Sequence, residues 1–186
     1  FGCADEETQN LCAGMNEEAQ SCGTMLDNFY TNVLSGQPLY RFRLDVEKVY
    51  AIVNQGLEQA FEDSKRRLDV EQQNIKQLYH GTPYANVKSI LDSGFRLPTW
   101  AGMFGKGIYF AETPQKSWSF GNHYLLVCDV LLGRQCRLDD ASPNFVPGDE
   151  IESVVGLRHA EGGVLRETEY VVYNPSQVVP RFLLQL

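Results

Sequence analysis

The chain has 186 residues, 43% of them hydrophobic and 22% charged, which suits one globular domain of roughly 150 residues with an added arm. Acidic residues outnumber basic ones by 24 to 16, a net charge of −8, and no stretch gathers Lys and Arg densely enough to neutralise a row of phosphates, so nucleic acid is not an expected partner. The longest apolar runs, residues 124–130 and 178–186, are far shorter than the ~20 residues that span a bilayer, so we expect no membrane partner.

Residues 1–24 are polar and predict an arm with at most one short helix, which leaves residues 25–186 for the domain. Because the first residue is Phe1 rather than Met, we expect a cut domain or a processed product. The five cysteines include no CxxC pair and no nearby His, so no metal site is expected. Free thiols in an intracellular, reducing compartment are favoured, and disulfides in a secreted effector or toxin are the alternative; the residues concerned are Cys3, Cys12, Cys22, Cys128 and Cys136.

The first strand pattern begins at residue 40. Apolar side chains alternate there with charged ones, which is typical of a half-buried strand; the apolar positions are Tyr40, Phe42, Leu44 and Val46. Apolar residues then recur every three or four positions, which predicts an amphipathic helix; they are Val49, Val53, Leu57, Ala60, Phe61 and Leu68. The charged residues between them fit a solvated face and indicate no function.

Two Thr-Pro pairs predict helix starts. In Thr82-Pro83 and Thr113-Pro114 the Thr can accept a backbone N–H as the N-cap, and the Pro suits the first helical position. The first of these helices should end at Gly94. Each helix follows a strand-like run, residues 75–79 and 107–111, so residues at the two junctions can converge at one end of a sheet.

Strand patterns dominate the rest of the chain, at residues 124–132, 134–138, 168–173 and 179–186. The stretch between Asp139 and Glu167 is rich in Gly and Pro and longer than most connections, so we interpret it as a candidate functional loop.

Three short motifs carry the functional argument. The first is Leu78-Tyr79-His80-Gly81-Thr82, in which an imidazole at a strand end lies beside a glycine whose bare backbone a ligand can reach. The second is Gly105-Lys106-Gly107-Ile108-Tyr109-Phe110-Ala111, followed by Lys116-Ser117, and the third is Glu169-Tyr170-Val171-Val172-Tyr173-Asn174-Pro175. Taken together and in this order, they resemble the catalytic domain of the poly-ADP-ribose polymerase family, the diphtheria-toxin-like ADP-ribosyltransferases.

The resemblance implies an α+β ADP-ribosyltransferase fold, with split, mostly antiparallel β-sheets around an NAD cleft and flanking helices. It places His80, Tyr109 and Glu169 at the family's His-Tyr-Glu triad. The nicotinamide amide would be held by the backbone of Gly81 and the hydroxyl of Ser117, with its ring between Tyr109 and Phe120. The other implied NAD contacts are Thr82, Arg96, Phe110, Ala111 and Lys116. Phe120 departs from the tyrosine common at its position, but a phenyl ring also stacks.

The chemistry agrees with these roles. Cleavage of the nicotinamide–ribose bond passes through an oxocarbenium-like state, which a carboxylate such as Glu169 stabilises. Gly105-Lys106-Gly107 lacks the third glycine of a Rossmann fingerprint, so hydride transfer is disfavoured. We therefore expect NAD as a substrate, a protein as the acceptor, no metal and a monomeric enzyme that leans towards mono-transfer. The family's helical regulatory subdomain is not expected before residue 40, so activity should not need DNA.

Glu167 and Glu169 share one face if both belong to a strand. Cholera-toxin-like transferases use such an acidic pair, but they also need an early-strand Arg and a Ser-Thr-Ser segment, which this chain lacks. Glu167 is a candidate acceptor-site residue, and a solvated edge position is the favoured alternative. Two other functions stay open, an NAD glycohydrolase and a catalytically inactive binding module.

Overall fold

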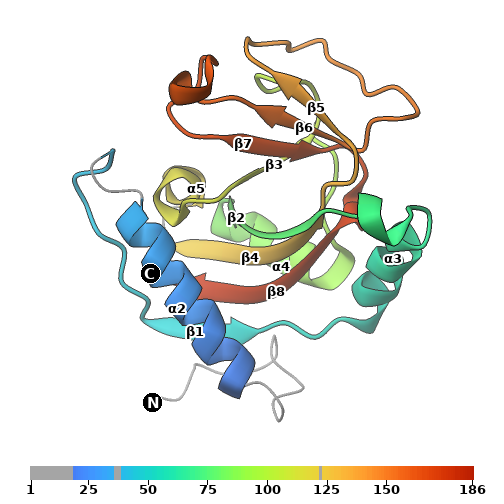
Figure 1. Ribbon diagram of the computed structural model, residues 1–186. Coiled ribbons are helices and arrows are strands. Elements are labelled where there is room, and N and C mark those ends of the chain that lie inside the picture. The colour runs from blue at the N-terminus through green and yellow to red at the C-terminus, as the bar shows by residue number, and fades with distance from the viewer. Residues whose placement is uncertain (1–18, 36–38, 122) are drawn as a thin grey trace.

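A computed structural model describes residues 19–35, 39–121 and 123–186 of the chain. Its eight-stranded sheet has the order β1-β8-β4-β2-β3-β7-β6-β5 (Figure 1). The strands are β1 (Lys48–Ala51), β2 (Ile75–Gly81), β3 (Ile108–Ala111), β4 (Tyr124–Leu131), β5 (Gln135–Leu138), β6 (Ser153–Gly156), β7 (Glu169–Val172) and β8 (Val178–Gln185). Every neighbouring pair is antiparallel except β5 and β6.

The sheet consists of two halves that meet between β2 and β3. These two strands pair only at Tyr79 and Ala111, whereas β2 pairs with β4 along seven residues. Apart from that single pair, β3 is hydrogen-bonded to β7, and β2 is hydrogen-bonded to β4. The fold is therefore the split, mostly antiparallel α+β arrangement that the sequence predicts, with its central opening at the ends of β2 and β3.

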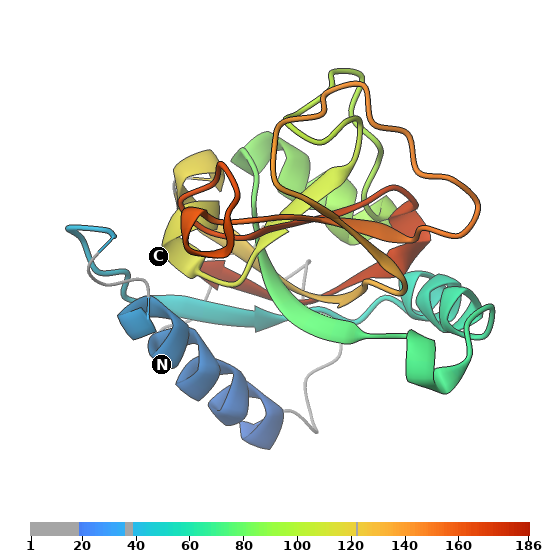
Figure 2. The ribbon, with the colours of Figure 1, turned by 45° about the horizontal axis from the view of Figure 1, so that its top comes forward.

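Four helices accompany the sheet in the described part of the chain: α2 (Ala19–Ser35), α3 (Gln55–Lys65), α4 (Tyr84–Ser93) and α5 (Pro114–Gly121). Helices α2 and α4 cover opposite faces of the β2–β4–β8 half (Figures 1 and 2). Along β4, Leu125 and Val127 pack against α2, while Leu126 and Cys128 pack towards α4. Because both faces are covered, β4 is apolar without alternation.

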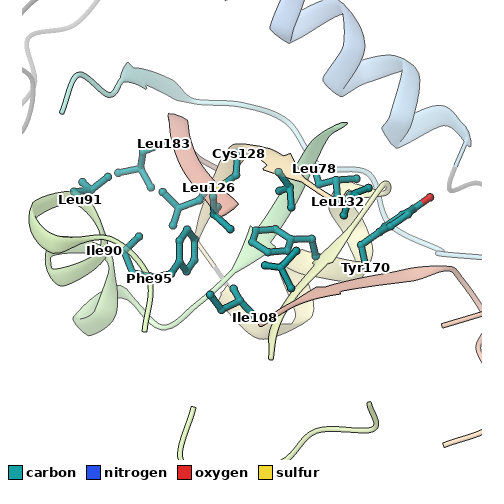
Figure 3. Close-up of a cluster of buried hydrophobic side chains, with 14 of the residues drawn as sticks. Leu78, Ile90, Leu91, Phe95, Ile108, Leu126, Cys128, Leu132, Tyr170 and Leu183 are labelled. Carbon is teal, nitrogen blue, oxygen red and sulfur yellow. The ribbon is translucent and has the colours of Figure 1, made fainter. Parts of the chain in front are cut away.

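The larger hydrophobic core lies between α4 and the sheet. Ile90 and Leu91 of α4 point towards Leu126 of β4 and Leu183 of β8, and Phe95 follows at the end of the helix (Figure 3). Asn54 caps α3 by accepting from the backbone N–H groups of Gly56 and Leu57, and its amide also donates to the Leu91 carbonyl. This second bond ties the start of α3 to the end of α4.

The N-terminal predictions need three corrections. Helix α2 begins at Ala19, inside the predicted arm. Residues 1–18, which include Cys3 and Cys12, lie outside the described residues. Residues 40–46 are not a strand; they alternate in burial but pair with no neighbour, and ladder bonding begins at Glu47 N–H to the Gln185 carbonyl. Val49 lies in β1 rather than in a helix, because pairing with Leu184 of β8 outweighs the local three-to-four periodicity.

Two further predictions are partly wrong. Helix α4 begins at Tyr84 with Pro83 as its N-cap, and Thr82 accepts a side-chain bond from Asn86 instead of capping the helix. Helix α5 begins at Pro114 and α4 ends at Gly94, as predicted. The stretch after Asp139, predicted as a loop, also contains β6, whose four buried residues pair in parallel with β5 and antiparallel with β7.

Candidate active site

A cavity of about 820 Å³ lies at the opening between the two half-sheets. Its walls come from the end of β2, from β3, from α5, from the start of β7 and from the segment after α4. Of the twelve residues selected from the sequence, eleven line it: His80, Gly81, Thr82, Arg96, Tyr109, Phe110, Ala111, Lys116, Ser117, Phe120 and Glu169. Three motifs that are far apart in the sequence thus contribute to one cavity.

His80 is held in a single tautomer. Its Nδ1 lies 2.9 Å from the Tyr109 carbonyl oxygen, which can only accept, so Nδ1 carries the proton and Nε2 is an acceptor. The ring packs edge-on against Phe95, at 4.9 Å between centroids, and against Phe110. Burial lowers the pKa of His80 to about 4, so the imidazole is neutral at neutral pH.

Gly81 is required for the close packing of β2 against α5. A Cβ at this position would lie 1.7 Å from the Ser117 carbonyl oxygen, a backbone atom that cannot move aside. The Ser117 hydroxyl is buried and donates to the Tyr79 carbonyl at 2.8 Å, which leaves its oxygen lone pairs available as acceptors. The sequence analysis attributed this glycine to ligand access, and the structure adds the packing reason.

Tyr109 organises the loop of residues 102–105. Its hydroxyl accepts from the Phe104 N–H and donates to the Gly105 carbonyl, both at 2.9 Å. Tyr173 donates to the Phe104 carbonyl at 2.6 Å, and Phe104 itself is fully buried. Burial raises the pKa of the Tyr109 hydroxyl, so it stays protonated. The phenol ring is therefore fixed as part of the cavity wall.

Glu169 forms an ion pair with Lys116 of α5. Lys116 Nζ lies 2.9 Å from Glu169 Oε1, and the two side chains are only 14% and 16% exposed. The same ammonium donates to the Glu167 carbonyl oxygen at 2.9 Å. Within the described residues Glu169 Oε2 has no hydrogen-bond partner, so one carboxylate oxygen is available on the cavity side.

Glu167 does not lie on a solvated edge, as the sequence analysis favoured, and it does not line the cavity. It precedes β7, so the shared strand face with Glu169 does not apply. Its side chain is 7% exposed and receives hydrogen bonds from Tyr40 and, at 2.7 Å, from Thr113. The two hydroxyls replace water for this buried carboxylate.

The segment from Phe95 to Met103 forms one wall of the cavity, and of this wall only Arg96 was predicted from the sequence. Trp100, 84% exposed, lies at the rim. The available signal was three large apolar residues, Leu97, Trp100 and Met103, in one Pro- and Gly-containing stretch directly after a helix end; all three are exposed.

Among the described residues, no cluster of three or more His, Cys, Asp or Glu side chains is arranged to hold a metal ion. Their helices are also too short or too polar to cross a membrane. Of the described cysteines, Cys128 and Cys136 are free thiols.

Comparison with known proteins identifies one family. The family model "Poly(ADP-ribose) polymerase catalytic domain" matches residues 24–157, a span that ends before Glu169. Human protein mono-ADP-ribosyltransferase PARP3 is 35% identical over 119 residues, which cover 58% of this chain and 22% of that protein. Human poly [ADP-ribose] polymerase 2 is 31% identical over 150 residues (59% and 26%), and its Arabidopsis thaliana namesake is 29% identical over 167 residues (69% and 25%). The chain thus spans about a quarter of the length of these relatives.

Proposed function

Because this chain belongs to the poly(ADP-ribose) polymerase catalytic domain family, we propose that it is an NAD-dependent ADP-ribosyltransferase that acts on a protein acceptor and releases nicotinamide. One observation carries the proposal: a single cavity gathers His80, Tyr109 and Glu169 from three different strands. Its volume of about 820 Å³ falls in the range of small-molecule and cofactor sites.

In the proposed complex, the nicotinamide end of NAD lies against α5. The carboxamide bonds to the backbone of Gly81 and to the Ser117 hydroxyl, which retains acceptor capacity for an amide N–H. The ring stacks between Tyr109, which its two hydroxyl contacts hold in place, and Phe120, which is 65% exposed. The adenosine side then extends past Arg96 towards the Trp100 rim.

His80 has the protonation state that this role requires. A neutral imidazole with its proton on Nδ1 presents Nε2 as an acceptor for a ribose hydroxyl. Because Nδ1 is held by the Tyr109 carbonyl, the direction of Nε2 is fixed before the substrate arrives. His80 is thus a binding and orienting group rather than a general acid.

Glu169 supplies negative charge where the reaction develops positive charge. When the bond between C1 of the ribose and the nicotinamide nitrogen breaks, its electron pair neutralises the pyridinium, and positive charge develops on the ribose. A carboxylate oxygen that accepts from a ribose hydroxyl stabilises this state more than the ground state. The acceptor nucleophile then bonds to C1 and loses its proton. We assign this contact to Glu169 Oε2, because Oε1 is paired with Lys116.

We also infer mono-transfer to protein, because the stretch from Asp139 to Glu167 leaves little chain to build a site for a growing polymer. A monomer that needs no metal is part of the same proposal. The free thiols of Cys128 and Cys136 fit an intracellular, reducing compartment.

The test uses labelled NAD with the purified chain, alone and with a cell lysate. The proposal expects nicotinamide release together with label on protein, and both should disappear in Glu169→Gln. The control is Glu150→Gln, which changes an exposed carboxylate outside the cavity and should retain both activities. Release of free ADP-ribose without labelled protein would show that the chain is an NAD glycohydrolase rather than a transferase. Binding of NAD without any cleavage would indicate an inactive binding module.

A further inference from the structure

Glu167 sits at the centre of a buried hydroxyl–carboxylate cluster that is separate from the cavity. Tyr40 donates to Oε2 and Thr113 donates to Oε1 at 2.7 Å. Both carboxylate oxygens are therefore bonded within the protein, and Glu167 does not line the cavity. No Lys or Arg side chain pairs with this carboxylate anywhere in the described residues, so its only direct contacts are those two hydroxyls.

The backbone of the same residue contacts the Lys116–Glu169 pair. Lys116 Nζ bridges two groups that are two residues apart in the chain, the Glu167 carbonyl and the Glu169 carboxylate, each at 2.9 Å. Thr113 and Lys116 lie at the start of α5, so one turn of the chain there forms two hydrogen bonds with Glu167, which lies just before β7. The hydrogen bonds of the Glu167 side chain thus fix the position of its own carbonyl oxygen, which accepts from the Lys116 ammonium.

Tyr40 connects a third segment, distant in the sequence, to the cluster around Glu167. Its ring packs edge-on against Phe42, and Phe42 packs against Trp118 of α5. Burial and the bond to Glu167 raise the pKa of the Tyr40 hydroxyl, which keeps its proton on the donor. The extended segment of residues 40–46 is therefore bound to α5 and to the approach to β7 at once, although it joins no strand.

We propose that Glu167 is a positioning residue, which acts through Lys116 to hold the Glu169 carboxylate at the ribose, and that Tyr40 and Thr113 complete its cluster. The inference rests on the proposed transferase function. It places Glu167 outside the acceptor site and gives it an effect on every reaction that begins with NAD cleavage. Because hydrogen bonds rather than charge hold the cluster, an amide of the same shape can replace the carboxylate.

The experiment is a double-mutant cycle on nicotinamide release. Glu167→Ala should lower kcat about tenfold, with the KM for NAD within twofold, and transfer to protein should fall by the same factor. Glu167→Gln should retain at least a third of kcat, since its Oε1 accepts from one hydroxyl and its amide donates to the other. Lys116→Met should lower kcat in its own right. In that background Glu167→Ala should cost less than twofold, because its effect passes through Lys116.

Three results would overturn the inference: Glu167→Ala with wild-type kcat, independent losses that multiply in the double variant, or a Glu167→Gln as damaged as Glu167→Ala. The matched control is Glu150→Ala, which removes an exposed carboxylate and should leave kcat unchanged. Nicotinamide affinity checks that each variant is folded. A wild type that cleaves no NAD would refute the proposed function instead. A crystal structure of Glu167→Ala would then test the positioning role separately. Loss of the ion pair between Lys116 and Glu169 would support it, and an intact ion pair would refute it.

Discussion

His80 should make the stability of this domain depend on pH. Its pKa falls from 6.5 to about 4 because burial disfavours the imidazolium. Between these two values the unfolded chain binds more protons at this position than the native protein does. Stability therefore rises with pH through the window from 4 to 6.5, and the contribution of His80 is lost as the pH falls through it. Above pH 6.5 both states are neutral at position 80, and the effect vanishes.

The expected size follows from the two pKa values. At pH 4.5 the unfolded imidazole is almost fully protonated and the native one is mostly neutral, which amounts to about 2.5 kcal/mol of lost stability relative to pH 8. Such a loss is a large share of the 5–15 kcal/mol typical of a domain of this kind. Carboxylates also titrate below pH 5, so the informative quantity is the difference between the wild type and a variant without this imidazole.

The assay is urea unfolding at a series of pH values from 4.5 to 8. His80→Gln should be less stable than the wild type at pH 8, since the bond from Nδ1 to the Tyr109 carbonyl is lost. The gap should close or reverse by pH 4.5. The control is His123→Gln, which removes an exposed histidine that does not line the cavity. Parallel curves for wild type and His80→Gln would refute the argument, because they would mean that His80 titrates alike in both states.

Four substitutions test the rest of the site. Gly81→Ala places a Cβ 1.7 Å from a backbone oxygen and should cost about 3 kcal/mol of stability or more in urea unfolding; a cost below about 1 kcal/mol would contradict the close packing. Ser117→Ala should weaken nicotinamide binding by on the order of 1 kcal/mol in calorimetry, and unchanged binding would place the carboxamide elsewhere. Phe120→Ala should change stability by less than about 0.5 kcal/mol, because the ring is largely exposed, yet weaken nicotinamide by about 1 kcal/mol; equal affinity would exclude stacking. Glu169→Gln should lower kcat for NAD cleavage by orders of magnitude with affinity within a few fold, and unchanged turnover would remove it from the reaction.

Most of the strands and the ends of two helices could be predicted from the sequence, because local chemistry specifies them. The stretch from Leu125 to Leu131 is apolar except for Asp129, which favours a strand, and the structure buries its apolar residues on both faces. Gly94 ends α4 with a φ of 78°, a conformation that favours glycine, and Pro114 begins α5. The three motifs contain nine of the eleven predicted residues that line one cavity, and the other two, Arg96 and Phe120, come from the family resemblance.

Segments whose state depends on a distant partner could not be predicted in this way. Residues 40–46 have the alternation of a strand, but no strand lies beside them to accept the ladder bonds. Val49 has a helical neighbour pattern, yet β8, more than 130 residues later, pairs with it. Strand β6 is four residues long, and its pairing with β5 on one side and β7 on the other gives it structure.

The chemistry of the site divides in the same way. The sequence determined which groups are present, because an imidazole, a phenol and a carboxylate in three family-like motifs indicate an ADP-ribosyltransferase whatever their exact placement. The tertiary structure decided their states: His80 is neutral because aromatic rings and a carbonyl surround it, and Glu169 is paired because α5 brings Lys116 to it. It also buried Glu167 under the hydroxyls of Tyr40 and Thr113, two residues that are far apart in the sequence. Burial and pairing depend on neighbours that are remote in sequence, and only the folded chain brings those neighbours together.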